Sequence, residues 1–311
     1  MSRATVSITR PRSEQGDLDQ HREHASADPE LLRPLGLEVG RQAIIRRNDS
    51  TFALYTLTDD GAEQDPGAVR MGDDGRGRLD GAGEEQFEAL LDSVAVDPDA
   101  TELEARSGEK LLELLDGPGH RGRLIVLAPH GGDIEPFTDR QAEHVRDLLA
   151  DVGVTCWRCK GWKPGGGAVA RWHITSTDIS TASFPRLGTV ATRGFRHAVS
   201  FHGFTEQGRP DVLIGGAASD ALKRVMRAVI AFALTGTDLR VEIAEAGDPL
   251  GGTEEDNVVN RFTRGRRNGV QIEQQVRART GTVPCTNQPT WQAIATAVAD
   301  VYRLVVDRDS S

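Results

Sequence analysis

The residue types best suited to catalysis gather in one Gly-rich segment. Residues 128–135 read Ala-Pro-His-Gly-Gly-Asp-Ile-Glu and follow an apolar run, so His130 and Glu135 share one loop. A His and a Glu supply two of the three protein ligands of a catalytic zinc site, whose fourth position is left for water. The alternative is a helix-capping loop with a solvated His. This segment alone does not separate the two interpretations.

A third ligand has to come from elsewhere in the chain, which contains eight His residues. His202 is the best candidate because it ends the apolar run 198–202 and precedes Gly203. Since ligands of α/β proteins bind at the carboxyl ends of strands, His202 is expected at the same sheet edge as His130. His173 is the competitor. Its place within the run 172–175 favours a hydrogen-bonded core residue, with contact to a substrate as the alternative.

Zinc-dependent hydrolysis also needs a general base that takes a proton from the attacking water. Glu273 is the predicted base. Polar and apolar side chains alternate along residues 269–275, which puts Glu273 on a polar face with Gln271 and Gln275 of an element that otherwise resembles a central strand. The alternative is an edge strand with one solvated face.

Asn260 and Arg261 are the predicted substrate-binding residues. They follow residues 247–253, which have the composition of a loop. The planar guanidinium of an arginine matches a carboxylate with two parallel hydrogen bonds. The pair is therefore expected to bind a substrate carboxylate, and the alternative is a surface arginine.

The elements that must position these residues begin near residue 123, where short apolar runs alternate with amphipathic helices. This pattern predicts an α/β fold, a single three-layer domain with a mostly parallel mixed central sheet flanked by helices. A capping box at Thr138 and Gln141 predicts the start of one helix, and others are expected over 218–234 and 288–306. Strands are predicted at 124–128, 155–158, 172–175, 198–201, 212–214, 239–243 and 270–272.

The N-terminal third of the chain has a different pattern. Residues 1–36 are polar, without a sustained period, and predict a disordered tail. The hydrolase domain is expected over 37–306, with the core α/β sheet in 123–306. Its N-terminal part, residues 37–115, is predicted to hold a hairpin over 42–56 and a helix over 84–115, where leucines recur at helical spacing.

Composition excludes several classes of protein. The 311 residues carry a formal charge of −10, with 37 Lys and Arg against 47 Asp and Glu, which argues against a nucleic-acid partner. No apolar stretch approaches the roughly 20 residues that span a bilayer. The first twenty residues lack the apolar core of a secretory signal, and three cysteines cannot form a disulfide framework. A cytoplasmic protein without a membrane partner is expected.

The segments named above, in this order, resemble the phage and bacterial poly-γ-glutamate hydrolase family, whose members are similar in fold to zinc carboxypeptidases. The resemblance covers residues 38–306. As a set the matching segments are specific, although each is short. They are residues 54–56, 69–72, 128–136, 173–177, 201–203, 214–216, 257–261 and 269–273.

The resemblance implies one zinc ion per chain, held by His130, Glu135 and His202, with Glu273 as general base. It implies poly-γ-glutamate as substrate and hydrolysis of amides formed through the γ-carboxyl. Zinc carboxypeptidases hold their His and Glu three residues apart, whereas these stand five apart, so Asp133 is an alternative ligand to Glu135.

Binding of a polyanion by an acidic protein calls for a local cationic groove. The arginines expected to form it are Arg261, Arg264, Arg266, Arg267 and Arg277. Two rival hypotheses stay open. One is a zinc deacylase of a small N-acyl amino acid, with a closed pocket, and the other is a non-catalytic binding protein associated with phage or replication machinery.

Overall fold

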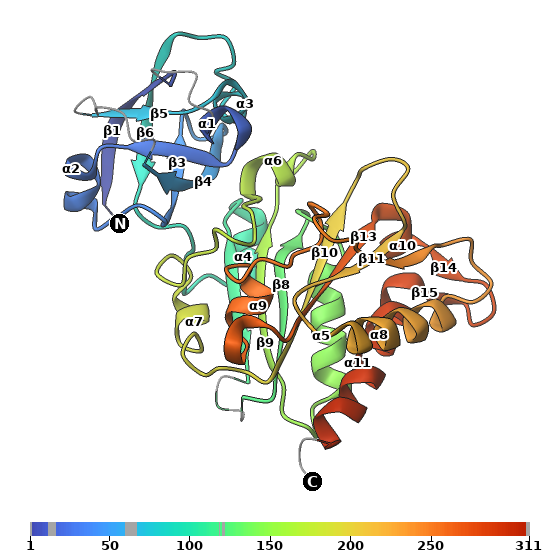
Figure 1. Cartoon of the computed structure of the whole chain (residues 1–311). Helices are drawn as coiled ribbons and strands as arrows, with labels where there is room; N and C mark the ends of the chain where they lie inside the picture. The colour runs from blue at the N-terminus through green and yellow to red at the C-terminus, as the bar shows by residue number, and fades with distance from the viewer. Residues whose placement is uncertain (1, 12–16, 60–66, 118, 120–121, 309–311) are drawn as a thin grey trace. The chain divides into compact units, whose positions relative to one another are not determined.

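The computed structural model describes the chain except for residues 1, 12–16, 60–66, 118, 120–121 and 309–311. The chain divides into two compact units (Figure 1). The barrel unit comprises Met1–Leu111 and Lys163–Pro185, and the sheet unit comprises Leu112–Trp162 and Arg186–Ser311. No helix among the described residues is both long and apolar enough to cross a membrane.

Six strands close a mixed barrel in the order β1-β5-β2-β4-β3-β6. Alternate residues of these strands, such as Val6 and Ile8, are buried in the interior of the barrel. The strands are β1 (Arg3–Thr9), β2 (His24–Ala27), β3 (Gln42–Arg46), β4 (Phe52–Thr58), β5 (Ala68–Arg70) and β6 (Gln86–Asp92). The helices of this unit are short: α1 (Asp17–Gln20), α2 (Pro29–Leu32), η1 (Arg33–Leu35), α3 (Asp73–Gly77), α4 (Glu102–Ser107) and α6 (Ala168–Trp172).

The sheet unit holds a seven-stranded sheet in the order β12-β11-β13-β10-β8-β9-β7. Strands β9, β8, β10 and β13 are parallel to one another, while β7 and β11 run antiparallel to their neighbours β9 and β13. The strands are β7 (Leu112–Asp116), β8 (Leu124–Gly132), β9 (Thr155–Gly161), β10 (His197–Phe204), β11 (Val212–Gly215), β12 (Val241–Ile243) and β13 (Gly269–Gln275). A separate pair is formed by β14 (Thr282–Val283) and β15 (Gln288–Pro289).

Three helices, α5, α8 and α11, pack against the sheet (Figure 1). Alternate strand residues, including Val126, Phe201 and Ile272, share their hydrophobic core. Neighbouring side chains along a strand point to opposite faces of the sheet. His202, next to Phe201, and Glu273, next to Ile272, therefore face away from this core. The remaining helices of the chain are α5 (Thr138–Leu148), α7 (Pro185–Gly188), α8 (Asp220–Ala233), α9 (Val258–Arg261), η2 (Arg264–Arg266), α10 (Val276–Thr280) and α11 (Thr290–Arg308).

The predicted single three-layer domain is wrong, because a closed barrel accompanies the sheet. The strand predicted at residues 172–175 is also wrong, because these residues form no strand. Helix α6 ends at Trp172, and His173 is its extended C-cap, with φ −66° and ψ 136°. Residues 163–185 belong to the barrel unit although they lie between β9 and β10 in the sequence.

The predicted disordered tail is also wrong over the described residues. Strand β1 pairs with β6 along its whole length. Its apolar residues Ala4, Val6 and Ile8 alternate with polar ones, and this short alternation suffices for a strand once a distant partner covers it. Residues 1 and 12–16 of that prediction lie outside the described residues.

The predicted helix over 84–115 is replaced by β6, α4 and β7. Its leucines come in adjacent pairs, which fit a strand as well as a helix, and pairing with β1 and β9 decides the outcome. The hairpin predicted over 42–56 is confirmed, because β3 and β4 pair in antiparallel fashion.

The predicted capping box at Thr138 and Gln141 is wrong as well. The N-cap of α5 is Phe137, which has a left-handed backbone with φ 78°. Gln141 is fully buried, and its amide exchanges two hydrogen bonds of 2.8 Å with the amide of Gln274 on β13. Gln141, which the sequence predicts as part of a helix cap, therefore links α5 to the sheet instead.

We expect Gln141→Leu and Gln274→Leu each to lower the free energy of unfolding by about 1–3 kcal/mol, because each leaves the other amide buried without its partner. The double variant removes both polar groups, so its loss should be smaller than the sum of the single losses. Urea denaturation of the four proteins measures this coupling. Strictly additive losses would contradict the paired arrangement.

Candidate metal centre

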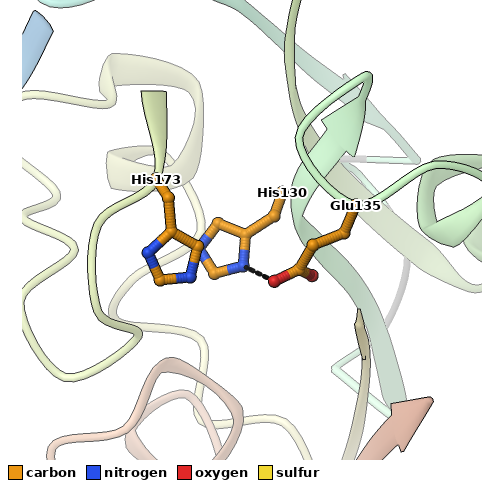
Figure 2. Close-up of side chains that lie close together, drawn as sticks. All are labelled: His130, Glu135 and His173. Carbon is orange, nitrogen blue, oxygen red and sulfur yellow. Dashed lines mark hydrogen bonds and ion pairs between the residues drawn. The ribbon is translucent and has the colours of Figure 1, made fainter. Parts of the chain in front are cut away.

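Three buried donors meet at the carboxyl edge of the sheet. His130 Nδ1 lies 3.0 Å from Glu135 Oε1 (Figure 2) and 3.3 Å from His202 Nδ1. His202 Nδ1 lies 3.8 Å from Glu135 Oε2. The exposed fractions of His130, Glu135 and His202 are 2%, 6% and 3%. The structure thus brings together the three side chains that the sequence predicts as ligands.

A β-bulge places His130 on the correct face of the sheet. Between Ala128 and Gly131 strand β8 advances three residues while its partner β9 advances two, from Arg158 to Lys160. One extra residue reverses the alternation of side chains along a strand. His130 therefore faces the same side as His202, whereas Ala128 faces the helices.

A closed turn brings Glu135 back to His130 across the intervening residues. The backbone N–H of Glu135 donates to the carbonyl of His130 at 2.8 Å, and the hydroxyl of Thr138 donates to the carbonyl of Glu135 at 2.8 Å. Gly132 allows the turn because its φ is +70° and a Cβ there would lie 2.7 Å from the Gly161 carbonyl oxygen. Asp133, the alternative ligand, is exposed.

The spacing of the three donors fits a tetrahedral ion. Bonds of about 2.0–2.1 Å around zinc put neighbouring ligand atoms about 3.3–3.4 Å apart. The two imidazole nitrogens are 3.3 Å apart, and the nearest carboxylate oxygens of Glu135 lie 3.0 Å from His130 (Oε1) and 3.8 Å from His202 (Oε2), around this value. Two imidazoles and one carboxylate are also donors that zinc accepts, and they leave a fourth position for water.

Glu273 stands next to His202, its register partner on the parallel strand β13. Its side chain is 6% exposed. Burial, and then repulsion from the Glu135 carboxylate, raise the pKa of Glu273 well above its ordinary value. The charge of Arg279 and a hydrogen bond of 3.0 Å from Gln271 Nε2 to Glu273 Oε1 act in the opposite direction.

Arg279, on α10, was missed by sequence analysis. It is only 3% exposed, and its Nη1 donates to the Pro136 carbonyl at 2.7 Å. Its guanidinium lies against Gly203, where a Cβ would be 2.4 Å from Cζ. Burial lowers the pKa of Arg279, while Glu135 and Glu273 raise it. The signal in the sequence is Gly203, the glycine after His202. It indicates that another group packs closely there but does not identify Arg279 as that group.

The predicted substrate-binding residues differ in their surroundings. Asn260 is fully buried, and its amide holds the backbone. Its Oδ1 accepts from the N–H of Ala217 at 3.1 Å, and its Nδ2 donates to the carbonyls of Gly252 at 2.8 Å and Glu254 at 2.9 Å. Arg261 is half-buried at the end of α9, with its guanidinium over the Phe262 ring.

His173, also drawn in Figure 2, belongs to the barrel unit. Its Nδ1 lies 2.6 Å from Glu23 Oε1, and its backbone carbonyl accepts from Arg78 at 3.3 Å. Its predicted contact with a substrate stays a prediction.

Two of the arginines expected to form a cationic groove have acidic partners. Arg277 pairs with Asp211 and Asp238, and Arg266 lies 2.7 Å from Asp256. These ion pairs offset the charge of both guanidinium groups. The cationic groove therefore stays a prediction, and Arg266 and Arg277 contribute less positive charge to it than unpaired arginines would.

Two imidazoles and a carboxylate at these separations, beside a further buried carboxylate, are suited to hydrolysis by metal-activated water. The family model for poly-gamma-glutamate hydrolase matches residues 101–288, more than half of the chain. The chain therefore belongs to the poly-gamma-glutamate hydrolase family. All predicted ligands, the base and the substrate-binding residues fall within the matched segment.

One curated relative matches about half of the chain at low sequence identity. The SPbeta prophage-derived UPF0714 protein YoqZ of Bacillus subtilis (strain 168) is 28% identical over 152 residues, which are 49% of this chain and 48% of that protein. The chain thus matches about half the length of this curated relative.

Comparison with solved structures matches a bacteriophage poly-gamma-glutamate hydrolase, with 22% identity, a TM-score of 0.47 and coverage of 63% of this chain and 90% of that one. The zinc-free apo form of YNDL has 20% identity, a TM-score of 0.43 and coverage of 64% and 90%. The rationally designed mkDPBB_sym2 protein has 14% identity, a TM-score of 0.25 and coverage of 30% and 100%.

We expect Gly203→Ala to lower the free energy of unfolding by about 1–3 kcal/mol, because the new methyl group displaces the buried guanidinium of Arg279. The matched control is the same substitution in an Arg279→Ala background, which removes the three atoms nearest to the methyl group. Thermal or urea unfolding measures both changes. An equal loss in the two backgrounds would show that the cost does not come from Arg279.

Proposed function

We propose that this chain hydrolyses the γ-glutamyl amide bonds of poly-γ-glutamate with one zinc ion, held by His130, Glu135 and His202. The observation that carries the proposal is the meeting of these three buried donors at separations that fit a tetrahedral ion. Membership of the poly-gamma-glutamate hydrolase family supports the choice of substrate.

In this proposal Glu273 is the general base. When bound, the ion supplies a Lewis acid that polarises the scissile carbonyl and makes the attacking water more acidic. Glu273 accepts the proton of that water as the new C–O bond forms. It then passes the proton to the leaving nitrogen as the C–N bond breaks, which releases an amine and a γ-carboxylate.

Burial, the largest cause of the raised pKa of Glu273, suits this exchange, because a buried carboxylate holds a transferred proton better than a solvated one. Arg279 limits the effect by adding a positive charge on the same side of the sheet. The two carboxylates thus have different tasks. Glu135 serves as ligand, and Glu273 exchanges protons.

Recognition of a substrate carboxylate is assigned to Arg261. The amide of Asn260 uses its oxygen and both donors on backbone groups, so its contribution is to hold the 252–254 loop next to α9. Replacement of Arg261 by Gln should therefore raise KM more than it lowers kcat, because the lost contact acts on bound substrate and transition state alike.

The first test is release of new amine ends from poly-γ-glutamate by the zinc-loaded protein. Removal of a general base costs about 10²- to 10⁴-fold in rate. We expect Glu273→Gln to lose activity by this factor while it keeps one zinc per chain. Turnover equal to wild type would exclude Glu273 as the base.

Wild-type protein that carries zinc but leaves the polymer intact would overturn the assigned substrate. In that case release of amino acids from small N-acyl amino acids becomes the diagnostic assay, because the same metal site serves a deacylase. A protein that binds no zinc and cleaves neither substrate would favour the non-catalytic alternative.

The second test measures zinc directly. We expect His202→Ala to lose stoichiometric zinc, because two protein donors bind the ion far more weakly than three. The matched control is His144→Ala, since His144 lies on α5 and its ring nitrogen bonds to Thr296 at 3.0 Å. Elemental analysis after dialysis compares the two variants. Full zinc content in His202→Ala would refute the proposed ligand set.

A further inference from the structure

A relay of side-chain amides ends on Glu273. Val259 N–H donates to Asn257 Oδ1 at 3.1 Å, and Asn257 Nδ2 donates to Gln271 Oε1 at 3.0 Å. Gln271 Nε2 then donates to Glu273 Oε1 at 3.0 Å and to the Leu250 carbonyl at 3.3 Å. The relay thus runs from the N-terminus of α9 to the proposed base.

The direction of this relay is fixed at its start. A backbone N–H only donates, so Asn257 must present its oxygen to Val259 and its NH₂ group to Gln271. Gln271 in turn must present its oxygen to Asn257 and its NH₂ group to Glu273. A side-chain amide can rotate by half a turn, but here each rotation would set two acceptors or two donors against each other.

The surroundings hold the relay in place. Asn257, Gln271 and Glu273 are 4%, 5% and 6% exposed, so water competes little with these bonds. Gly252 provides the space for the Gln271 amide, because a Cβ at this position would lie 2.4 Å from Oε1. Its φ of +57° also favours glycine.

We propose that Gln271 is the positioning residue of Glu273, and that Asn257 sets the direction in which the Gln271 amide donates. The bond from Gln271 fixes Oε1 of Glu273 and leaves Oε2 for the proton of the attacking water. This inference rests on the proposed function of Glu273 as base. It explains how Gln271 and Glu273 are both buried on the polar face of β13, since the amide of one hydrogen-bonds to the carboxylate of the other.

Asn257→Asp is the decisive variant, because it reverses the relay with almost no change in shape. An aspartate still caps α9, since aspartate is as good an N-cap as asparagine. It has only acceptors, so Gln271 must rotate to donate to it, and the Gln271 oxygen then faces Glu273. Gln271→Glu sets a second carboxylate beside Glu273 directly.

We expect both variants to lower kcat by about 10- to 100-fold, since displacement of a catalytic group by about 1 Å costs rates of this order. KM and zinc content should stay at the wild-type values, because neither residue is assigned to substrate or metal. The matched control is Gln275→Glu, the same change on the same face of β13, where the side-chain amide donates to the Glu206 carbonyl and not to Glu273. It should keep wild-type kcat.

Crystal structures of the zinc-loaded variants give a readout that needs no substrate. Glu273 should leave its wild-type position in Asn257→Asp and in Gln271→Glu, and keep it in Gln275→Glu. An unmoved Glu273 in both test variants would overturn the inference, as would unchanged kcat with an active wild type. An inactive wild type would instead refute the proposed function, and the crystal structures would still decide the role of Gln271.

Discussion

The sheet unit is organised around two carboxylates, Glu135 and Glu273, that are buried close to each other. A buried charge is costly unless it is paired or hydrogen-bonded, and two like charges repel. The Gly203 N–H and the Gln271 amide hydrogen-bond to these carboxylates, while the buried guanidinium of Arg279 offsets their charge. A divalent cation held by the proposed ligands His130, Glu135 and His202 would complete this compensation.

Local backbone features serve this arrangement. The bulge in β8 turns His130 toward His202, and the closed turn after it returns Glu135 to the same point. Gly203 has two roles, because its N–H donates to Glu135 Oε2 at 2.9 Å and its missing side chain makes room for Arg279. A residue with a side chain at this position would keep the hydrogen bond to Glu135 but would occupy the space of the Arg279 guanidinium.

The sequence alone predicts which proposed site residues lie at strand ends. His130, His202 and Glu273 each lie near the carboxyl end of a strand, and parallel pairing brings such ends together. The barrel was not predicted, because β1 lies in a polar segment and pairs with residues 77 to 89 positions further along the chain. Arg279 and the direction of the Gln271 amide depend on contacts across elements, which spacing along one chain does not encode.

The most direct test of the account is a crystal structure of the zinc-loaded protein, with anomalous scattering measured at the zinc edge. The account predicts one strong peak at about 2.0–2.2 Å from His130 Nδ1, His202 Nδ1 and an oxygen of Glu135. Glu273 should lie beside it without binding the ion. A peak held by other ligands, or none at this position in protein that carries one zinc per chain, would contradict the central claim.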